Sequence, residues 1–232
     1  MIRFSLFQGS RPGKRDFGEG NAHMASNRLH ELDFASLIGS RICHDLISPV
    51  GAITNGLEVL ADNPDEEMKK VALDLIANSA RQAARKLAFV RLAFGAAGGM
   101  GTDISLGDAQ DLAQEFLAED KRISLSWNAP RENRPKPVVK LLMNLLLIAM
   151  GCIPRGGEIS VDVQGDELKL RARGKKAAFP DKTAAVLTGE MPAQEINAHE
   201  IQPYYTLMLL ERTGYGLDIE QGEDEVLIIA RP

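Results

Sequence analysis

Two long stretches of helical periodicity, separated by a short break, constrain the fold of this chain more than any other feature. Over about residues 33–60 and again over about 65–94, apolar residues recur at steps of three and four, which is the spacing of one helix face. The residues "ADNPD" (61–65) interrupt the pattern with a turn signal. Two long helices joined by so short a loop must run antiparallel, so the sequence predicts a helical hairpin. The stripes are Ala35, Ile38, Ile42, Leu46, Pro49 or Val50, Ile53, Leu57 and Leu60, then Met68, Ala72, Leu75, Ser79, Ala83, Leu87, Val90 and Phe94.

A single hairpin leaves much of this apolar surface in contact with water. Pairing two hairpins into a four-helix bundle would bury it, and a homodimer is the simplest way to do so. A glycine-rich stretch, "GAAGGMGTD" (95–103), then marks a domain boundary. The predicted organisation is therefore a disordered leader (1–24), a hairpin domain (25–95), a linker (96–103) and a second domain (104–232).

The second domain alternates between helical and strand patterns. This alternation predicts one mixed sheet with helices on a face, so the whole chain is of the α+β class, a helical hairpin followed by an α/β sandwich. The expected helices are 106–118, 138–152, 181–187 and 204–212, and the expected strands are 122–127, a hairpin at 158–173 that turns at Gly165-Asp166, 216–220 and 225–230.

Composition excludes several classes of function. Of the 232 residues, 44% are hydrophobic and 25% are charged, which suits globular domains with sizeable cores, and the formal net charge of -5 argues against nucleic acid or anionic membranes as partners. The most apolar run (138–153) contains Lys140 and Asn144 and is shorter than the roughly 20 residues that a bilayer requires. Cys43 and Cys152 both lie in apolar helical patterns, so we expect buried, reduced thiols that serve packing in a cytoplasmic protein.

The stretch "RICHDLISPVGAI" (41–53) places a histidine and an acid side by side on the first helix. His44 is two positions from both Ile42 and Leu46, which belong to the apolar stripe. At about 100° per residue, a step of two turns a side chain by about 200°, so His44 is expected to point into solvent. Its own face is small and polar, comprising Ser40, Arg41, Ser48, Gly51 and Asn55.

Asp45 and Pro49 give this histidine a setting suited to chemistry. A carboxylate beside an imidazole can hold the proton of one ring nitrogen and leave the other as a nucleophile. Pro49 cannot donate a helical hydrogen bond, so it bends the helix and frees the carbonyl of Asp45, four residues earlier. An exposed His–Asp pair is by itself an ordinary surface feature, however. The other histidines, His23, His30 and His199, show no partner pattern.

The complete string "HDLISP" (44–49) is more specific. It resembles the phospho-acceptor box of sensor histidine kinases, in which His-Glu/Asp-Leu-x-Ser/Thr-Pro lies on the first helix of a dimeric hairpin. Each defined position of that box matches here in residue type and spacing, and the predicted hairpin supplies the structural context. The resemblance implies that His44 accepts a phosphoryl group.

The second domain resembles a kinase ATP-binding domain that has lost its nucleotide boxes. "NLLLIA" (144–149) keeps Asn144, but Ile148 replaces a second asparagine, and an apolar side chain cannot orient Mg²⁺ and phosphates. "RARGKKAAFP" (171–180) lacks the Asp-x-Gly-x-Gly pattern, and "EIQPYYTLMLLE" (200–211) lacks the glycines of a phosphate lid.

This combination resembles the ChpT-type histidine phosphotransferases. The stretches "SRICHDLISPVGAITNGLEVL" (40–60) and "LLMNLLLIAMGCIPRGGEISV" (141–161) carry the resemblance, which extends over roughly residues 30–232. It implies a homodimer that takes a phosphoryl group from the receiver domain of a hybrid sensor kinase and passes it to response regulators, including those of the CtrA type. It implies no cofactor of its own, because the receiver brings Mg²⁺.

Four residues are candidates for contacting the receiver. Reflecting His44 through the centre of the loop places Arg81 level with it on the second helix and Arg85 one turn farther from the loop. Arg41 could pair with phosphoryl oxygens and Ser48 could donate a hydrogen bond. For Arg81 and Arg85, an equally good interpretation is that they are ordinary surface residues exposed to solvent, with no role in docking. Apolar contacts could come from Leu37 and Val59.

Two alternatives remain open at this point. The chain could be an active histidine kinase with a divergent nucleotide pocket, or a non-catalytic scaffold whose histidine is idle. ATP binding separates the kinase from the phosphotransferase, and acid-labile phosphate on His44 separates both from the scaffold.

Overall fold

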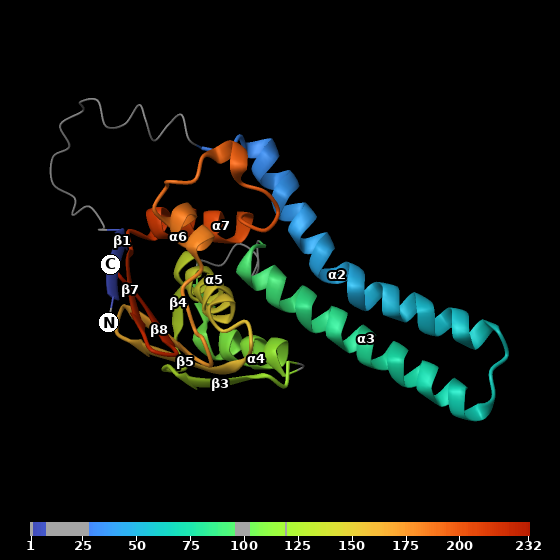
Figure 1. Cartoon of the computed structure of the whole chain (residues 1–232). Helices are drawn as coiled ribbons and strands as arrows, with labels where there is room; N and C mark the ends of the chain where they lie inside the picture. Colours follow the sequence, from blue (N-terminus) through green and yellow to red (C-terminus); the bar gives the residue numbers. More distant parts are fainter. Residues whose placement is uncertain (1, 8–27, 96–102, 119) are drawn as a thin grey trace, which may run out of the picture.

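The structure is a computed structural model in which a long helical hairpin projects from a compact α/β domain (Figure 1). The hairpin consists of α2 (Glu31–Ala61) and α3 (Glu66–Ala93), which pack along each other. This confirms the fold class expected from the sequence. The residues that the structure describes are 2–7, 28–95, 103–118 and 120–232.

Side-chain caps fix where the two long helices begin. The Nδ1 atom of His30 accepts a hydrogen bond from the backbone N–H of Leu32 at 3.3 Å. At the start of α3, Asp65 Oδ1 accepts from the Met68 N–H at 2.8 Å. Such caps satisfy backbone donors that a helix leaves unpaired in its first turn. The turn that the sequence predicted therefore lies between Ala61 and Glu66.

Small residues let the two helices approach closely, while other apolar positions stay uncovered. A Cβ atom added to buried Gly56 would lie 2.6 Å from Cγ1 of Ile76, so only glycine fits there. In contrast, Val50 is 51% exposed, Leu57 is 55% exposed and Leu87 is 52% exposed. The single chain thus buries only part of the stripes read from the sequence.

The C-terminal domain contains a six-stranded sheet in the order β1-β7-β8-β6-β5-β3. Neighbouring strands are antiparallel except for β3 and β5, which run parallel. A separate pair joins β2 and β4. The elements are β1 (Ile2–Phe7), β2 (Asp103–Ser105), α4 (Leu106–Leu117), β3 (Ile123–Asn128), β4 (Asn133–Pro135), α5 (Lys136–Cys152), β5 (Gly157–Gln164), β6 (Glu167–Arg173), α6 (Asp181–Leu187), the 3-10 turn η1 (Ala193–Glu195), α7 (Ile201–Thr213), β7 (Gly216–Gly222) and β8 (Glu225–Arg231).

Helix α5 is the centre of the core. It contacts α3 on one side and strands β6 and β8 on the other, and Figure 1 shows it between the hairpin and the sheet. Leu141, Leu142, Leu145 and Leu146 are fully buried. Burial on all sides explains why this helix reads as nearly continuous apolar sequence rather than as a stripe. No helix in the described parts of the chain has the length and apolar character needed to cross a membrane.

One strand lies where the sequence predicted a disordered leader. Residues Ile2–Phe7 form β1, which pairs antiparallel with β7, a strand that would otherwise be at the edge of the sheet, so the prediction is wrong for that segment. The string "IRFSLF" alternates apolar and other residues, which is a strand pattern, and an edge strand offers unpaired backbone groups to it. Residues 8–24 of the predicted leader, and 96–102 of the predicted linker, lie outside the described residues.

A second apolar cluster joins the start of α2 to the C-terminal domain. Buried Val186, Ile196, Ile201 and Tyr204 form its centre, on the segment that runs from α6 to α7. The Tyr204 hydroxyl also accepts a hydrogen bond from the Leu29 N–H at 3.0 Å. The residues packed against this centre are Leu29, Phe34, Leu37, Ile38 and Met191. Leu37, expected to offer an apolar contact to a partner, is therefore half-buried against the chain's own C-terminal domain.

Candidate functional site

His44 projects from the outer face of α2, as its position relative to the apolar stripe predicted. Its side chain is 72% exposed. Ser48, one turn later, is exposed as well. Most of the imidazole is open to solvent, so a folded protein could approach it directly.

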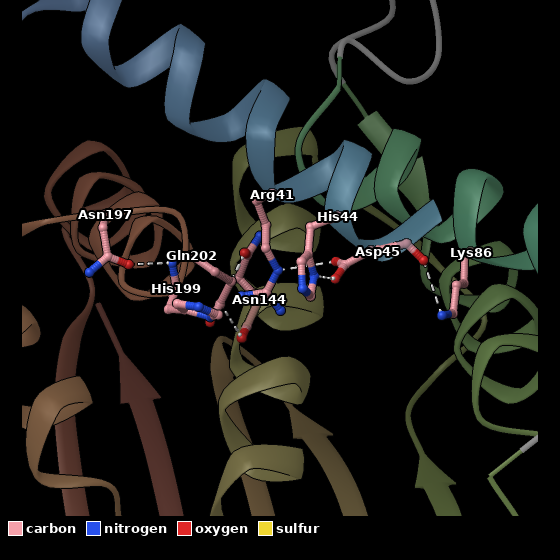
Figure 2. A network of polar contacts seen from close by, with 8 residues as sticks. All are labelled: Arg41, His44, Asp45, Lys86, Asn144, Asn197, His199 and Gln202. Carbon is pink, nitrogen blue, oxygen red and sulfur yellow. Dashed lines mark hydrogen bonds and ion pairs between the residues drawn. The ribbon is translucent and has the colours of Figure 1, made fainter. Parts of the chain in front are cut away.

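Asp45 orients the imidazole and is itself held by Arg41 (Figure 2). Its Oδ1 atom lies 3.5 Å from Nδ1 of His44, and its Oδ2 atom accepts a hydrogen bond from Arg41 Nε at 3.1 Å. A carboxylate facing Nδ1 favours the tautomer with the proton on that nitrogen. The Nε2 atom then carries the lone pair and points away from Asp45, which is the arrangement of a nucleophile.

The carbonyl of Asp45 is paired by a lysine from the other helix. Pro49 lies inside α2, and because it has no N–H, the carbonyl four residues earlier loses its helical partner. Lys86 Nζ donates to that carbonyl at 3.1 Å (Figure 2). The sequence predicted the freed carbonyl, and the structure supplies its partner.

The contact between Lys86 and Asp45 also shows which residues of the two helices lie level with each other. Asp45 on α2 faces Lys86 on α3, and farther along the hairpin Gly56 faces Ile76. His44, next to Asp45, therefore lies about level with Lys86. The predicted level of Arg81 is therefore wrong: it lies about 7 Å nearer the loop than residue 86, at about 1.5 Å per residue. The error arises because the loop is centred later than assumed and because the helices are staggered.

The two later arginines accordingly have different surroundings. Arg81 is exposed, and its Nη2 atom donates to Asn78 Oδ1 on its own helix at 2.5 Å. Arg85 is half-buried and lines a groove of about 660 Å³ that also includes Arg41, Asp45 and Lys86. Phe89, Phe116 and Met150 belong to the same groove, which runs between the hairpin and the C-terminal domain.

The two cysteines differ in their exposure to solvent. Cys152 is buried, and burial raises the pKa of its thiol to about 12, which fits the packing role expected from the sequence. Cys43 is exposed, so the expectation of a buried thiol is wrong there. The apolar pattern around Cys43 comes from neighbours on both sides of the helix, and position 43 itself faces solvent.

A second histidine lies next to His44 and was missed by sequence reasoning. His199 precedes α7, and its ring centroid is 6.0 Å from that of His44, with the rings 75° apart. The backbone N–H of His199 donates to Asn197 Oδ1 at 2.8 Å (Figure 2). Only the docking of the two domains brings His199 here, and no local pattern in the sequence encodes that docking.

The remnant of the asparagine box has a structural role. The buried Asn144 side chain donates through Nδ2 to the carbonyl of Ala93 at 3.0 Å and to that of Lys140 at 2.9 Å. Its Oδ1 atom accepts from Gln202 Nε2 at 3.2 Å. These contacts tie α5 to the end of α3 and to α7. Ile148 is also buried, at 3% exposure.

No metal centre is evident in the described ranges. Among those residues, no group of three or more His, Cys, Asp or Glu side chains is arranged to hold a metal ion. The exposed imidazole, with a carboxylate facing Nδ1, offers nucleophilic chemistry.

Comparisons with known proteins identify the family of this chain. The family described as "Histidine phosphotransferase C-terminal domain" matches residues 106–225. Protein phosphotransferase ChpT of Brucella abortus (strain 2308) is 43% identical over 206 residues, which cover 87% of this chain and 97% of that protein. A solved structure described as a bacterial phosphotransferase superposes with a TM-score of 0.80 at 40% identity, covering 89% of this chain and 99% of the other. The chain is a protein phosphotransferase and belongs to the ChpT-type histidine phosphotransferase family.

Proposed function

We propose that this protein relays a phosphoryl group through His44, from the receiver domain of a hybrid sensor kinase to the aspartate of response regulators. The observation that carries the proposal is the exposed imidazole whose Nδ1 faces the Asp45 carboxylate. The ChpT relative and the family match support transfer of a phosphoryl group in general. The receiver partners follow from the acceptor box and from the resemblance to the family.

The chemistry needs little from this chain beyond a positioned nucleophile. An aspartyl phosphate is an activated acyl phosphate, so a neutral imidazole nitrogen can displace its carboxylate in line. The resulting phosphoramidate is reactive enough to pass the group to a second aspartate. Catalysis of phosphoryl transfer rests largely on positioning and charge stabilisation. We propose that Mg²⁺ arrives with the receiver and that this chain contributes no cofactor.

The receiver is proposed to dock beside His44 over Arg41, Ser48, Arg81 and Arg85. Arg41 and Arg85 line the groove next to Asp45, and basic groups complement the acidic, Mg²⁺-binding site of a receiver. Response regulators of the CtrA type are the proposed acceptors, as in the family. The site of action is proposed to be the cytoplasm, since Cys43 and Cys152 are free thiols.

We also propose that two chains form the active protein. Most of the exposed large apolar residues in the described part of the chain lie on the hairpin, where Ile47, Val50 and Leu57 recur at steps of three and seven along α2. The hairpin also exposes Val71 and Leu87 on α3. Exposed apolar residues gathered on one part of a molecule mark a protein interface, and a second hairpin packed on the side of α2 that carries Val50 and Leu57 would complete a four-helix bundle.

The first prediction concerns the acceptor. His44→Gln is expected to abolish transfer from a phosphorylated receiver, because the nucleophile is gone. The free energy of unfolding should change by no more than about 0.5 kcal/mol, since the side chain is exposed. Acid-labile label on the protein and thermal unfolding provide the two measurements. If the variant acquired label at the wild-type rate, His44 would not be the acceptor, and a wild-type protein that never acquires label would support the scaffold alternative.

The second prediction distinguishes the two arginines. Arg85→Ala should weaken binding of a receiver domain about 2- to 5-fold, the loss of about 0.5–1 kcal/mol that a partly exposed ion pair contributes. Arg81→Ala, the matched control on the same helix, should have the smaller effect because it lies nearer the loop. Titration calorimetry at two salt concentrations provides the measurement. Equal affinities for wild type and Arg85→Ala would remove Arg85 from the docking surface.

The third prediction concerns the dimer. Wild-type protein should sediment as a dimer at micromolar concentration, and Leu57→Glu should shift it toward monomer by placing a charge in the apolar interface. Met208→Glu is the matched control, because Met208 is an exposed apolar residue of the C-terminal domain. It should leave the dimer intact. A wild-type monomer under these conditions would contradict the four-helix bundle.

The fourth prediction separates the phosphotransferase from a kinase. No heat of binding should be detected when ATP and Mg²⁺ are titrated into the protein, because Asn144 is buried in structural hydrogen bonds and Ile148 offers no oxygen. Incubation with labelled ATP should leave His44 unlabelled. Micromolar affinity for ATP or autophosphorylation would favour the kinase alternative.

A further inference from the structure

The site around His44 is built from both domains of the chain. His44 lies on α2 of the hairpin, and His199 comes from the segment between α6 and α7 of the C-terminal domain. Their ring centroids are 6.0 Å apart in an edge-on arrangement. The His199 side chain is exposed, and its ring makes no hydrogen bond to any residue that the structure describes.

The position of His199 is fixed by packing on both sides of it. The Asn197 side-chain Oδ1 accepts a hydrogen bond from the His199 N–H at 2.8 Å, and the Asn197 backbone carbonyl accepts from the N–H groups of Glu200 at 3.1 Å and Ile201 at 3.0 Å. Ile196 and Ile201, which flank this turn, are buried in the cluster that contacts α2. The imidazole is therefore held next to His44 by the same contacts that dock the two domains.

The other basic groups beside His44 have hydrogen-bond partners. Arg41 Nε donates to the Asp45 carboxylate, and Lys86 Nζ donates to the Asp45 carbonyl. A phosphoryl group on Nε2 of His44 brings strong acceptor oxygens to the side of the ring away from Asp45. A ring at the distance of His199 can reach those oxygens by rotation of its side chain.

We propose that His199 binds the phosphoryl group during its transfer to and from His44, by donating a ring N–H to one of the phosphoryl oxygens. This inference rests on the proposed function. It makes the C-terminal domain a contributor to the reaction site and assigns a role to a histidine that lies immediately before α7.

His44 acts as the nucleophile in the transfer step. The lone pair of His44 Nε2 attacks the phosphorus of the receiver's aspartyl phosphate and forms the N–P bond. The P–O bond to the aspartyl group breaks, and the carboxylate leaves with the electron pair. The proton on Nδ1 stays in place beside Asp45, and His199 keeps the proton that it donates. Transfer onward to a second aspartate reverses these steps.

The kinetic experiment compares wild type, His199→Ala and His199→Gln under single turnover, with the concentration of phosphorylated receiver varied. Loss of one hydrogen bond to a charged group should slow the maximal rate about 10- to 100-fold. The receiver concentration at half-saturation should stay the same, and glutamine, which keeps an N–H donor, should restore part of the rate. Gln194→Ala, an exposed position in the same segment, is the control and should match wild type.

A second readout does not require a receiver. The protein is phosphorylated with potassium phosphoramidate, and the ³¹P resonance of phospho-His44 is identified by its absence in His44→Gln. The resonance should shift in His199→Ala and remain in place in Gln194→Ala. Thermal unfolding of each variant shows whether it is folded.

The outcomes separate the two proposals. If wild type takes no phosphate from any receiver, the relay fails, while a ³¹P shift in His199→Ala would still support phosphoryl binding by His199. If wild type transfers and His199→Ala has the same maximal rate and the same resonance, the inference is overturned. A change in half-saturation alone would make His199 a docking residue and would overturn it as well.

Discussion

The apolar contact between the start of α2 and the segment from α6 to α7 governs the rest of the arrangement. It holds the C-terminal domain against the hairpin at the end where His44 lies, through Ile196, Ile201 and Tyr204. Asn144 and Gln202 extend the contact into the core. Asn144 and Gln202 thus join helices together, and the C-terminal domain is held in a fixed position beside His44.

The environment of His44 follows from a short chain of local causes. Pro49 removes one helical hydrogen bond, and Lys86 compensates for it at the Asp45 carbonyl. The Asp45 side chain is held by Arg41 and faces Nδ1 of His44. Each step restricts the imidazole further without covering it. An exposed but oriented histidine suits a protein whose reaction partners are other proteins.

The features that could be predicted from the sequence depend on local periodicity. The hairpin, the outward direction of His44, the carbonyl freed by Pro49 and the turn at Gly165 all follow from helix and strand repeats within one element. The level of Arg81 could not be predicted reliably, because each one-residue shift in the loop centre moves the facing residue by two and because the stagger of the two helices leaves no signal in the sequence.

Contacts between distant segments were beyond such reasoning. His199 reaches His44 only because Ile196 and Ile201 dock on α2, and strand β1 joins β7 across nearly the whole length of the chain. Cys43 is a further case in which the pattern within one helix gave the wrong environment. Its apolar neighbours suggested burial, while the position itself faces solvent. Each of these features depends on tertiary packing, which cannot be inferred from the periodicity of a single helix or strand.

The most direct test of the account is to mix the purified protein with a receiver domain labelled at its aspartyl phosphate, with no nucleotide present, and to follow the label over time. The account predicts that label appears on this chain in an acid-labile, base-stable form, and then moves to a second, unlabelled receiver added later. Label that remains on the first receiver, or that reaches this chain only when ATP is supplied, would contradict it.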